Sequence, residues 1–383
     1  MKRIIVKHTE KEGSLMSQSY YRPTFIQVDL QAIKSNIKHL KEKLQKHTSI
    51  MAIVKANAYG HGAIEVANAA LQAGATLLAV ASPEESVQLR DAGVTADILV
   101  LGASPISFLP IASERNITLT AYSYEWLFAT RHFTKSFKTH IKIDSGMGRI
   151  GFVQQEELQK ALVFVRDRKW INVTGVFTHF STADEEDATH FKKQIAAFEQ
   201  MLDLFEQRPA IVHTSNSAAT LRNPSQDWDA VRFGISMYGI APSPWIDENL
   251  PFPLERALSL HTEVVHVKRV KKGTSIGYGA SYTASSDEWI ATLPIGYADG
   301  LLRKLHNQSV LIKGKRMPIV GKICMDQCMI RLDEQVDIGE KVVLLGKQMN
   351  EEIRIEEWAN ALQTIPYEIC CTFSNRLPRL YSE

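Results

Sequence analysis

The sequence predicts an α/β fold in which an N-terminal (β/α)8 barrel of the TIM type is followed by a smaller all-β C-terminal domain. Three observations support this prediction. Eight short apolar runs alternate with amphipathic stretches between residues 50 and 233, and eight is the strand number of such a barrel. Proline pairs at 242/244 and 251/253 interrupt the pattern and suit a domain boundary. After residue 254, apolar and polar residues alternate between glycine-marked turns, as in an antiparallel sheet.

The eight apolar runs have the length of buried strands. They cover residues 50–54, 77–81, 98–101, 117–121, 140–143, 173–177, 210–214 and 229–233. The stretches between them repeat apolar residues at helical spacing, most clearly at 83–92, 124–133, 155–166 and 188–206. Alternating strands and helices also fit an open doubly wound sheet, and the pattern alone does not separate that sheet from a barrel.

The predicted organisation has three parts. Residues 1–20 are polar and charged and are expected to form a flexible tail, residues 21–250 the barrel, and residues 251–383 the β domain. The apolar run at 4–6 is too short for a signal peptide, and no apolar run reaches the length of a membrane span. We therefore expect a cytoplasmic protein with no membrane partner.

Charge and cysteine content disfavour several classes of function. The formal net charge is +2 and there is no long basic stripe, which argues against a nucleic-acid partner. The four cysteines occur in a C-x3-C spacing, at Cys324 and Cys328, and as the adjacent pair Cys370 and Cys371. Neither arrangement is a zinc signature or a disulfide framework. We expect no metal.

Residues 51–62 (Met-Ala-Ile-Val-Lys-Ala-Asn-Ala-Tyr-Gly-His-Gly) form the most informative segment. An apolar run ends on Lys55 and is followed by small residues, Tyr59 and two glycines. Burial disfavours a charged ammonium group, but a lysine in this position is tolerable where its amine acts as a nucleophile on an aldehyde. The ordinary alternative is a lysine whose stem lies along apolar surface while its amine reaches solvent.

Other polar residues also stand near the ends of the predicted strands. The carboxyl ends of barrel strands meet at one rim, where such barrels place their chemistry, so we expect these side chains to converge there. Each one alone is more often a buried side chain with a structural partner. They are Lys55, Arg149, His179, Asn216, Ser217 and Arg232.

Two glycine-containing segments concern phosphate binding. Residues 146–151 match the dinucleotide-binding pattern G-x-G-x-x-G. They follow the fifth strand rather than the first, and Arg149 occupies the turn that would approach a pyrophosphate, so we reject a dinucleotide site. Residues 231–239 join the last strand to a short helix, and the backbone N–H groups of Gly234 and Ile235 at its start suit a phosphate.

Six segments together resemble the alanine racemases, a family of barrel enzymes that use pyridoxal 5′-phosphate. They are residues 51–62, 141–151, 231–239, 275–282, 294–300 and 321–327, in the order the family has them. The resemblance extends from Tyr21 to Tyr381. It implies that Lys55 carries the cofactor and that Tyr278, in the β domain, is the second catalytic base.

The resemblance implies roles for further residues. Arg149 would pair with the substrate carboxylate and the cofactor's phenolic oxygen, and Arg232 would face the pyridine nitrogen. In many relatives the lysine that matches Lys142 is carbamylated, which would make it an anion able to hold Arg149. The remaining assignments are Tyr59, Ser217 and Tyr367 as phosphate ligands, with Gly234, Ile235 and Asn216 also at the cofactor, His179 near its ring, Tyr297 at the substrate entrance, and Met325, whose backbone contacts the substrate carboxylate.

The expected function is therefore racemisation of alanine, with L-alanine and D-alanine as partners and a two-base mechanism on pyridoxal 5′-phosphate. The family precedent is a homodimer with shared active sites, and its product D-alanine supplies bacterial peptidoglycan. The alternatives are a broader amino-acid (serine) racemase, a pyridoxal-phosphate decarboxylase and a non-catalytic cofactor-binding protein. Arg232 in the place of a carboxylate disfavours the decarboxylase, and a carrier needs neither Tyr278 nor Met325.

Overall fold

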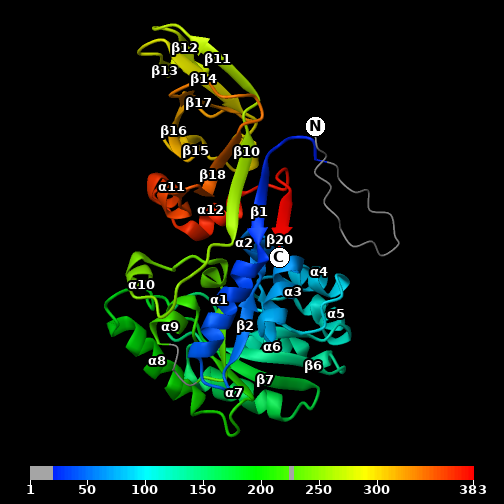
Figure 1. Cartoon of the computed structure of the whole chain (residues 1–383). Helices are drawn as coiled ribbons and strands as arrows, with labels where there is room; N and C mark the ends of the chain where they lie inside the picture. Colours follow the sequence, from blue (N-terminus) through cyan, green and yellow to red (C-terminus); the bar gives the residue numbers. More distant parts are fainter. Residues whose placement is uncertain (1–19, 224–227) are drawn as a thin grey trace. The chain divides into compact units, whose positions relative to one another are not determined.

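The computed structural model describes residues 20–223 and 228–383, and the chain forms two compact units. One unit is Leu30–Arg256. The other combines the described residues before Leu30 with Ala257–Glu383 (Figure 1). The tail expected at residues 1–20 lies outside the described residues, apart from Tyr20.

The first unit is built on an eight-stranded parallel sheet that is nearly closed into a barrel (Figure 1). The spatial order is β8-β7-β6-β5-β4-β3-β2-β9, so the first and last strands of the pattern, β2 and β9, pair in parallel. The Arg232 N–H on β9 donates to Ser215 O, beyond the end of β8, at 2.9 Å. This arrangement confirms the predicted barrel and excludes the open doubly wound sheet. The strands are β2 (Ser49–Ile53), β3 (Leu77–Val80), β4 (Asp97–Val100), β5 (Ile117–Ala121), β6 (Phe137–Lys142), β7 (Ile171–Phe177), β8 (Ile211–His213) and β9 (Ala230–Phe233).

Helices alternate with these strands, as the helical spacing predicted. The start of α4 illustrates the local cause: the Glu85 N–H donates to Ser82 Oγ, the Ser82 N–H donates to the Glu85 carboxylate, and Pro83 occupies the first turn. The stretch predicted at 124–133 ends as an α-helix at Ala129 and continues as a single 3-10 turn. The helices are α1 (Leu30–Lys43), α2 (Lys55–Tyr59), α3 (Ala63–Ala73), α4 (Pro83–Asp91), α5 (Leu109–Glu114), α6 (Tyr124–Ala129), α7 (Gln155–Arg166), α8 (Thr189–Leu202), α9 (Ser217–Arg222) and α10 (Pro244–Glu248), with 3-10 turns η1 (Ile106–Phe108), η2 (Thr130–His132) and η3 (Ile235–Tyr238).

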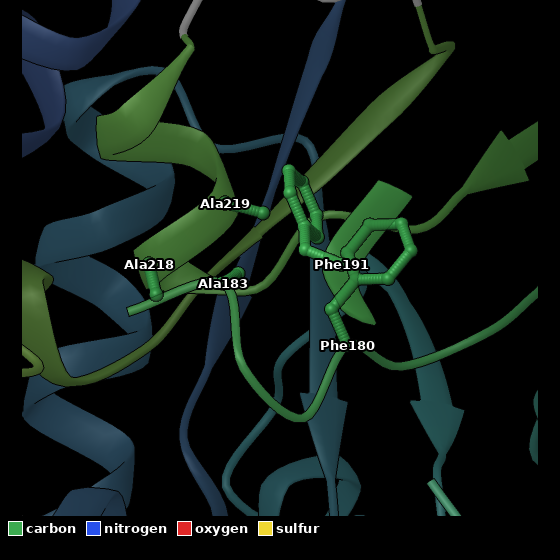
Figure 2. Close-up of a cluster of buried hydrophobic side chains, with 5 residues drawn as sticks. All are labelled: Phe180, Ala183, Phe191, Ala218 and Ala219. Carbon is green, nitrogen blue, oxygen red and sulfur yellow. The ribbon is translucent and has the colours of Figure 1, made fainter. Parts of the chain in front are cut away.

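A buried hydrophobic cluster supports the loops that follow β7 and β8 (Figure 2). Phe180 and Phe191 pack edge to face with their ring centroids 4.7 Å apart, an arrangement that aromatic pairs prefer. Because the cluster includes the residues directly after His179 and Ser217, it holds the two loops that carry these candidate residues. Its members are Phe180, Ala183, Phe191, Ala218 and Ala219.

The second unit consists mostly of strands. One sheet has the order β11-β14-β17-β16-β15-β18-β10-β1-β20, β19 pairs with β18, and β12 and β13 form a separate short pair. In addition to the strands predicted for an all-β domain, the unit contains the helices α11 (Ile355–Leu362) and α12 (Pro366–Thr372). The other elements are β10 (Leu258–Glu263), β11 (His266–Val270), β12 (Ser275–Ile276), η4 (Tyr278–Ala280), β13 (Tyr282–Thr283), β14 (Glu288–Leu293), η5 (Tyr297–Asp299), η6 (Arg303–Leu305), β15 (Ser309–Ile312), β16 (Lys315–Val320), β17 (Cys328–Leu332), β18 (Lys341–Gln348), β19 (Glu351–Ile353) and β20 (Arg379–Ser382).

Strand β1 (Phe25–Asp29) belongs to this second unit, although residues from 21 onward were expected in the barrel. It pairs antiparallel with β10 and parallel with β20. Ile26 and Val28 are buried and their neighbours only partly so, which is the alternation of a strand with one buried face. The alternation that is typical of a strand is visible in the local sequence. The partner strands lie far away in the chain, so the local sequence does not indicate which sheet the strand joins.

Candidate active site

The candidate residues of the barrel unit lie at the carboxyl ends of its strands, as expected. Lys55 begins α2 directly after β2, Lys142 is the last residue of β6, and His179 follows β7. Arg232 lies in β9, and its Nη2 is 3.1 Å from Nδ1 of His179. This contact joins the end of β9 to the end of β7. The structure thus brings side chains from four strands to one rim.

Arg232 is the buried centre of this rim, with 3% of its surface exposed. Its Nη2 donates to Thr178 O at 2.8 Å and to Thr214 O at 2.7 Å, and its Nη1 donates to His213 O at 2.9 Å. Within the described part of the chain, none of its hydrogen bonds goes to a carboxylate. Burial, and then the charge of Arg149, lower the pKa of Arg232 to about 9, so the guanidinium stays cationic at neutral pH.

Three histidines around Arg232 are held neutral. Burial lowers the pKa of His140 to about 3. Burial and then Arg232 keep the pKa of His179 and His213 well below their usual range. A guanidinium only donates hydrogen bonds, so Nδ1 of His179 accepts from Arg232 and the proton of this imidazole is on Nε2. His179 therefore brings a hydrogen-bond donor to the rim, and no positive charge of its own.

Lys142 is a buried amine whose basicity is strongly reduced. Lys142 has 2% of its surface exposed, and its Nζ donates to Ile143 O at 2.6 Å. Burial, and then the charge of Arg232, lower the pKa of Lys142 from 10.5 to about 7. A large share of this amine is therefore unprotonated at neutral pH, which is the form that reacts with electrophiles.

The G-x-G-x-x-G segment binds an internal carboxylate. Asp144 Oδ1 accepts from the N–H groups of Gly146, Met147 and Gly148 at 2.8–3.0 Å, and Oδ2 accepts from that of Arg149 at 2.9 Å. Burial alone would raise the pKa of Asp144, but these donors and the charge of Lys142 lower it. Since the N–H groups that would cradle a pyrophosphate are occupied by Asp144, the structure supports rejection of a dinucleotide site. The side chain of Arg149 is exposed.

The chain after Lys55 makes a left-handed turn. Four consecutive non-glycine residues, Ala56 to Tyr59, have φ between 51° and 53°, a conformation that costs about 1–2 kcal/mol per residue. The Glu85 carboxylate holds the start of this turn, accepting from the Ala56 N–H at 2.6 Å and from the Ala81 N–H at 2.7 Å. Asn57 Oδ1 accepts from the Ala63 N–H at 2.9 Å and holds its other side. The strain is thus stored beside the candidate nucleophile.

Hydroxyl and N–H groups gather around Gly234. Its N–H donates to Ser217 Oγ at 2.9 Å. A Cβ at Gly234 would lie 3.0 Å from Tyr59 Oη and 3.6 Å from Ser217 Oγ, so the space that glycine leaves open faces both hydroxyls. The structure therefore brings Tyr59, Ser217 and Gly234 together, and Ile235 follows Gly234 in the chain.

Asn216 has a structural task at this position. Its Oδ1 accepts from the Ala219 N–H at 3.0 Å and caps α9, and its Nδ2 donates to Phe180 O at 3.1 Å. Both polar ends of the side chain are thus engaged within the protein.

The remaining candidates, Tyr278, Tyr297, Met325 and Tyr367, lie in the second unit. Tyr278 is 66% exposed, Met325 54% and Tyr297 40%, and Tyr367 is partly buried in α12. Two of these residues are brought together: the Tyr297 N–H donates to Cys324 O and the next N–H, of Ala298, donates to Met325 O, both at 3.0 Å.

Sequence reasoning missed three residues that organise the rim: Glu85, Asp144 and His213. Glu85 had a signal, because Ser82 followed three residues later by glutamate is a capping box. Asp144 stands before a glycine-rich turn, which is a position where Asp binds the backbone N–H groups that follow it. His213 lies inside the predicted strand 210–214 and had no distinguishing pattern.

In the described residues, no group of three or more His, Cys, Asp or Glu side chains could hold a metal ion. Across the same residues, no helix has the length and apolar character needed to cross a membrane.

Comparison with known proteins shows similarity along nearly the whole chain. The alanine racemase N-terminal domain family matches residues 28–242, and the alanine racemase C-terminal domain family matches residues 257–381. The chain is 47% identical to alanine racemase 1 of Bacillus subtilis (strain 168) over 371 residues, which cover 96% of this chain and 95% of that protein.

Solved structures agree. The alanine racemase from E. faecalis superposes with a TM-score of 0.92 at 44% identity, covering 94% of this chain and 98% of that one. The alanine racemase from Bacillus anthracis with bound L-Ala-P gives a TM-score of 0.91 at 47% identity, covering 95% and 96%.

Proposed function

The chain belongs to the alanine racemase family, and we propose that it interconverts L-alanine and D-alanine with pyridoxal 5′-phosphate as its cofactor. The observation that carries this proposal is the buried Arg232, a cation bound by neutral acceptors at the centre of the rim that also holds Lys55. Substrate breadth beyond alanine, such as serine, is an outcome of the test below.

The residues of the barrel fit the cofactor. Lys55 would hold its aldehyde carbon, and the space above Gly234, which a Cβ would fill, would take its phosphate between Tyr59 Oη and Ser217 Oγ. The Gly234 and Ile235 N–H groups would add donors, Asn216 would hold the loop, and His179 would lie near the ring. Tyr367, which belongs to the second unit, is assigned as a further phosphate donor. When bound, the cofactor acidifies the Cα–H of the amino acid by accepting electron density.

Racemisation requires a proton to leave one face of Cα and return on the other. We assign these transfers to Lys55 on one face and Tyr278 on the other. Because His179 is held neutral, it can orient a tyrosine by hydrogen bonding but does not supply the cation that lowers a phenol's pKa. The charged groups available for that purpose on the rim are Arg232 and Arg149.

Arg232 would face the ring nitrogen and favour racemisation over other chemistry. Its guanidinium remains charged at neutral pH, so protonation of the ring nitrogen beside it would be disfavoured. An unprotonated ring would accept electron density less strongly. Negative charge on the substrate would then be short-lived, which would limit the side reactions that depend on it. A decarboxylase or transaminase needs the opposite electrostatics, a carboxylate in this position.

The substrate carboxylate is assigned to Arg149 and to the backbone at Met325, with Tyr297 at the entrance. We propose that Lys142 becomes carbamylated. Its lowered pKa supports this, because carbon dioxide reacts with a neutral amine. The product would be an anion on the same strand end as Arg149 and would orient that guanidinium.

We propose that the enzyme is a homodimer with shared sites, in which the β domain (251–383) of one subunit supplies Tyr278 and Met325 to the barrel (21–250) of the other. The exposure of Tyr278, Met325 and Tyr297 supports this, because contiguous exposed apolar side chains mark interaction surfaces and the Tyr297 and Met325 loops are in contact. In a bacterium the product would supply peptidoglycan synthesis from the cytoplasm.

The test is D-alanine formation from L-alanine by purified protein supplied with pyridoxal 5′-phosphate. A racemase produces an equimolar mixture from either enantiomer, and Lys55→Ala abolishes the conversion. Release of carbon dioxide from the amino acid would instead identify a decarboxylase. Cofactor binding with neither product would identify a carrier, and conversion of serine at a comparable kcat/KM would identify a broader racemase.

A further inference from the structure

Asp299 is a fully buried carboxylate in the second unit, next to two of the candidate substrate-binding residues. It ends the short turn η5 that begins at Tyr297, and its side chain is 0% exposed. Both terminal nitrogens of the Arg22 guanidinium donate to it, Nη1 to Oδ2 at 2.9 Å and Nη2 to Oδ1 at 2.6 Å. The Gly296 N–H donates to Oδ2 at 3.0 Å, which ties the carboxylate to the start of its own turn.

A second arginine extends this contact to the Met325 loop. Arg376 Nε is 3.5 Å from Asp299 Oδ1, and its Nη2 donates to Asp326 Oδ1 at 2.7 Å. Asp326 directly follows Met325 in the chain. The four side chains form one continuous ionic network, here called the Asp299 network: Arg22, Asp299, Arg376 and Asp326.

The backbone of the two loops is in contact at the same place. The Tyr297 and Ala298 N–H groups donate to Cys324 O and Met325 O. A Cβ on Gly296 would lie 2.4 Å from both carbonyl oxygens, so the loops approach as closely as glycine allows. The position of the Met325 backbone is thus set by the turn that Asp299 anchors.

We propose that Asp299 is a positioning residue for substrate binding, which holds the Met325 backbone and the Tyr297 ring in the geometry that receives the substrate carboxylate. This inference rests on the proposed racemase function and on the assignment of Met325 to the carboxylate. Asp299 itself is enclosed by protein groups and does not touch substrate. Arg22, from the segment before β1, and Arg376, from the segment before β20, hold it from both sides.

The alternative is that the Asp299 network only stabilises the unit. The two roles predict different kinetic changes. If the groups that bind the substrate carboxylate are displaced, substrate and transition state are bound more weakly by the same amount, so KM rises while kcat is retained. A purely structural loss lowers the thermal midpoint and leaves KM unchanged in the protein that remains folded.

The experiment compares Asp299→Asn and Arg376→Gln with Asp287→Asn in the full-length protein loaded with pyridoxal 5′-phosphate. Asp287→Asn is the control, because it removes a carboxylate of the same unit that pairs with Lys271 at 2.8 Å and accepts from the Lys272 N–H, two residues that lie outside both loops. Arg376→Gln is included because Arg376 is 45% exposed and its replacement keeps the Arg22 pair. Measurements are kcat, KM for each enantiomer, the thermal midpoint, and the inhibition constant of propionate, which is alanine without its amine.

We expect KM and the propionate inhibition constant to rise together, about tenfold or more in Asp299→Asn and less in Arg376→Gln, with kcat within about threefold of the unchanged protein. Asp287→Asn should match the unchanged protein. The inference would be overturned if KM and the propionate inhibition constant were unaltered in Arg376→Gln, and in Asp299→Asn if that variant folds. In that case the proposed racemase function would still stand. If the unchanged protein does not racemise alanine, the proposed function itself has failed.

Discussion

Nη1 of Arg232 lies 2.9 Å from Nδ1 of His213, and this contact sets the protonation pattern of the barrel interior. Because arginine only donates, Nδ1 of His213 accepts and the imidazole proton is on Nε2. That nitrogen is 2.9 Å from Nδ1 of His140, so the hydrogen bonds run in one direction from Arg232 through His213 to His140. The His213 ring is fixed by stacking on Phe177, with centroids 4.8 Å apart and planes at 6°.

Replacement of His213 by phenylalanine should destabilise the protein. The new ring keeps the stacking on Phe177 but leaves a buried N–H of Arg232 and a nitrogen of His140 without their partner. Each unsatisfied group costs about 1–3 kcal/mol, which urea unfolding of the apoprotein measures. His39→Phe is the control, because Nδ1 of His39 is buried without a hydrogen-bond partner in the described structure. Equal losses in the two variants would mean that the hydrogen bonds of His213 contribute nothing.

Reduction of the cofactor-loaded protein with borohydride should attach the pyridoxyl group to Lys55, which peptide mapping identifies. The most serious competitor is Lys142, because its pKa of about 7 leaves a large share of this amine unprotonated at neutral pH. Geometry decides between them, since Lys142 is 2% exposed and donates to Ile143 O, whereas Lys55 is only partly buried. A label on Lys142 would refute the assignment of Lys55.

The buried Lys142 predicts a pH-dependent stability. Its folded pKa of about 7 lies below the ordinary value of 10.5, so between these values the unfolded chain binds more protons and stability rises with pH. In bicarbonate-free buffer, Lys142→Met should therefore be more stable than the unchanged protein at pH 7, and its advantage should shrink by up to about 1.4 kcal/mol per pH unit. Urea unfolding at pH 7, 8 and 9 measures this.

Lys138→Met is the control for that experiment, because Lys138 is a partly exposed lysine of the same strand. Parallel pH profiles for Lys142→Met and the unchanged protein would show that the amine is not the source of the dependence.

Glu85 should matter for cofactor binding through the left-handed turn. Glu85→Gln keeps the size of the side chain but replaces one of the two oxygens that accept from Ala56 and Ala81 with an amide donor. The strained turn then loses an anchor, and we expect the dissociation constant of pyridoxal 5′-phosphate to rise about tenfold, equivalent to one charge-assisted hydrogen bond. Equilibrium dialysis gives the constant. Glu84→Gln, one position earlier, should bind like the unchanged protein, and an equal effect in both would argue against the anchor.

Shared active sites predict complementation between inactive variants. Lys55→Ala and Tyr278→Ala each abolish activity alone, but in a heterodimer both lesions fall in one pocket and the other pocket is intact. After unfolding and refolding an equimolar mixture, about a quarter of the unchanged activity should return, since half of the dimers are heterodimers with one working site. Heterodimers confirmed by differential tagging and yet inactive would show that each chain supplies both bases to its own site.

The barrel was predictable from sequence because its signals are local. The run at 117–121 became β5 with the same bounds, and the stretch 155–166 became α7. Strand β6 was predicted to start at 140 but starts at Phe137, because Lys138 interrupts the apolar pattern while its backbone still pairs with Asn172. Apolar periodicity detects runs of apolar residues, and it misses a buried strand end where polar residues interrupt the run.

The polar residues near the strand ends were predictable as a set but not as a network. Lys55, Arg232 and Ser217 were proposed from strand ends and family resemblance, whereas His213 acts through contacts with Arg232 and His140, which are distant in the sequence. The G-x-G-x-x-G pattern shows the limit clearly, because its N–H groups do bind a carboxylate oxygen, and that carboxylate belongs to Asp144.

The position of β1 between β10 and β20 has a consequence for the order in which the protein is made. The barrel, Leu30–Arg256, is one continuous stretch and can close while the ribosome is still translating the rest. Phe25–Asp29 leaves the ribosome earlier, yet its parallel partner ends at Ser382. At translation rates of about 5–20 residues per second, roughly 20 to 70 seconds pass before that partner exists. Strand β1 can thus pair with β10 once that strand has been made, but its other edge stays open until β20 is complete.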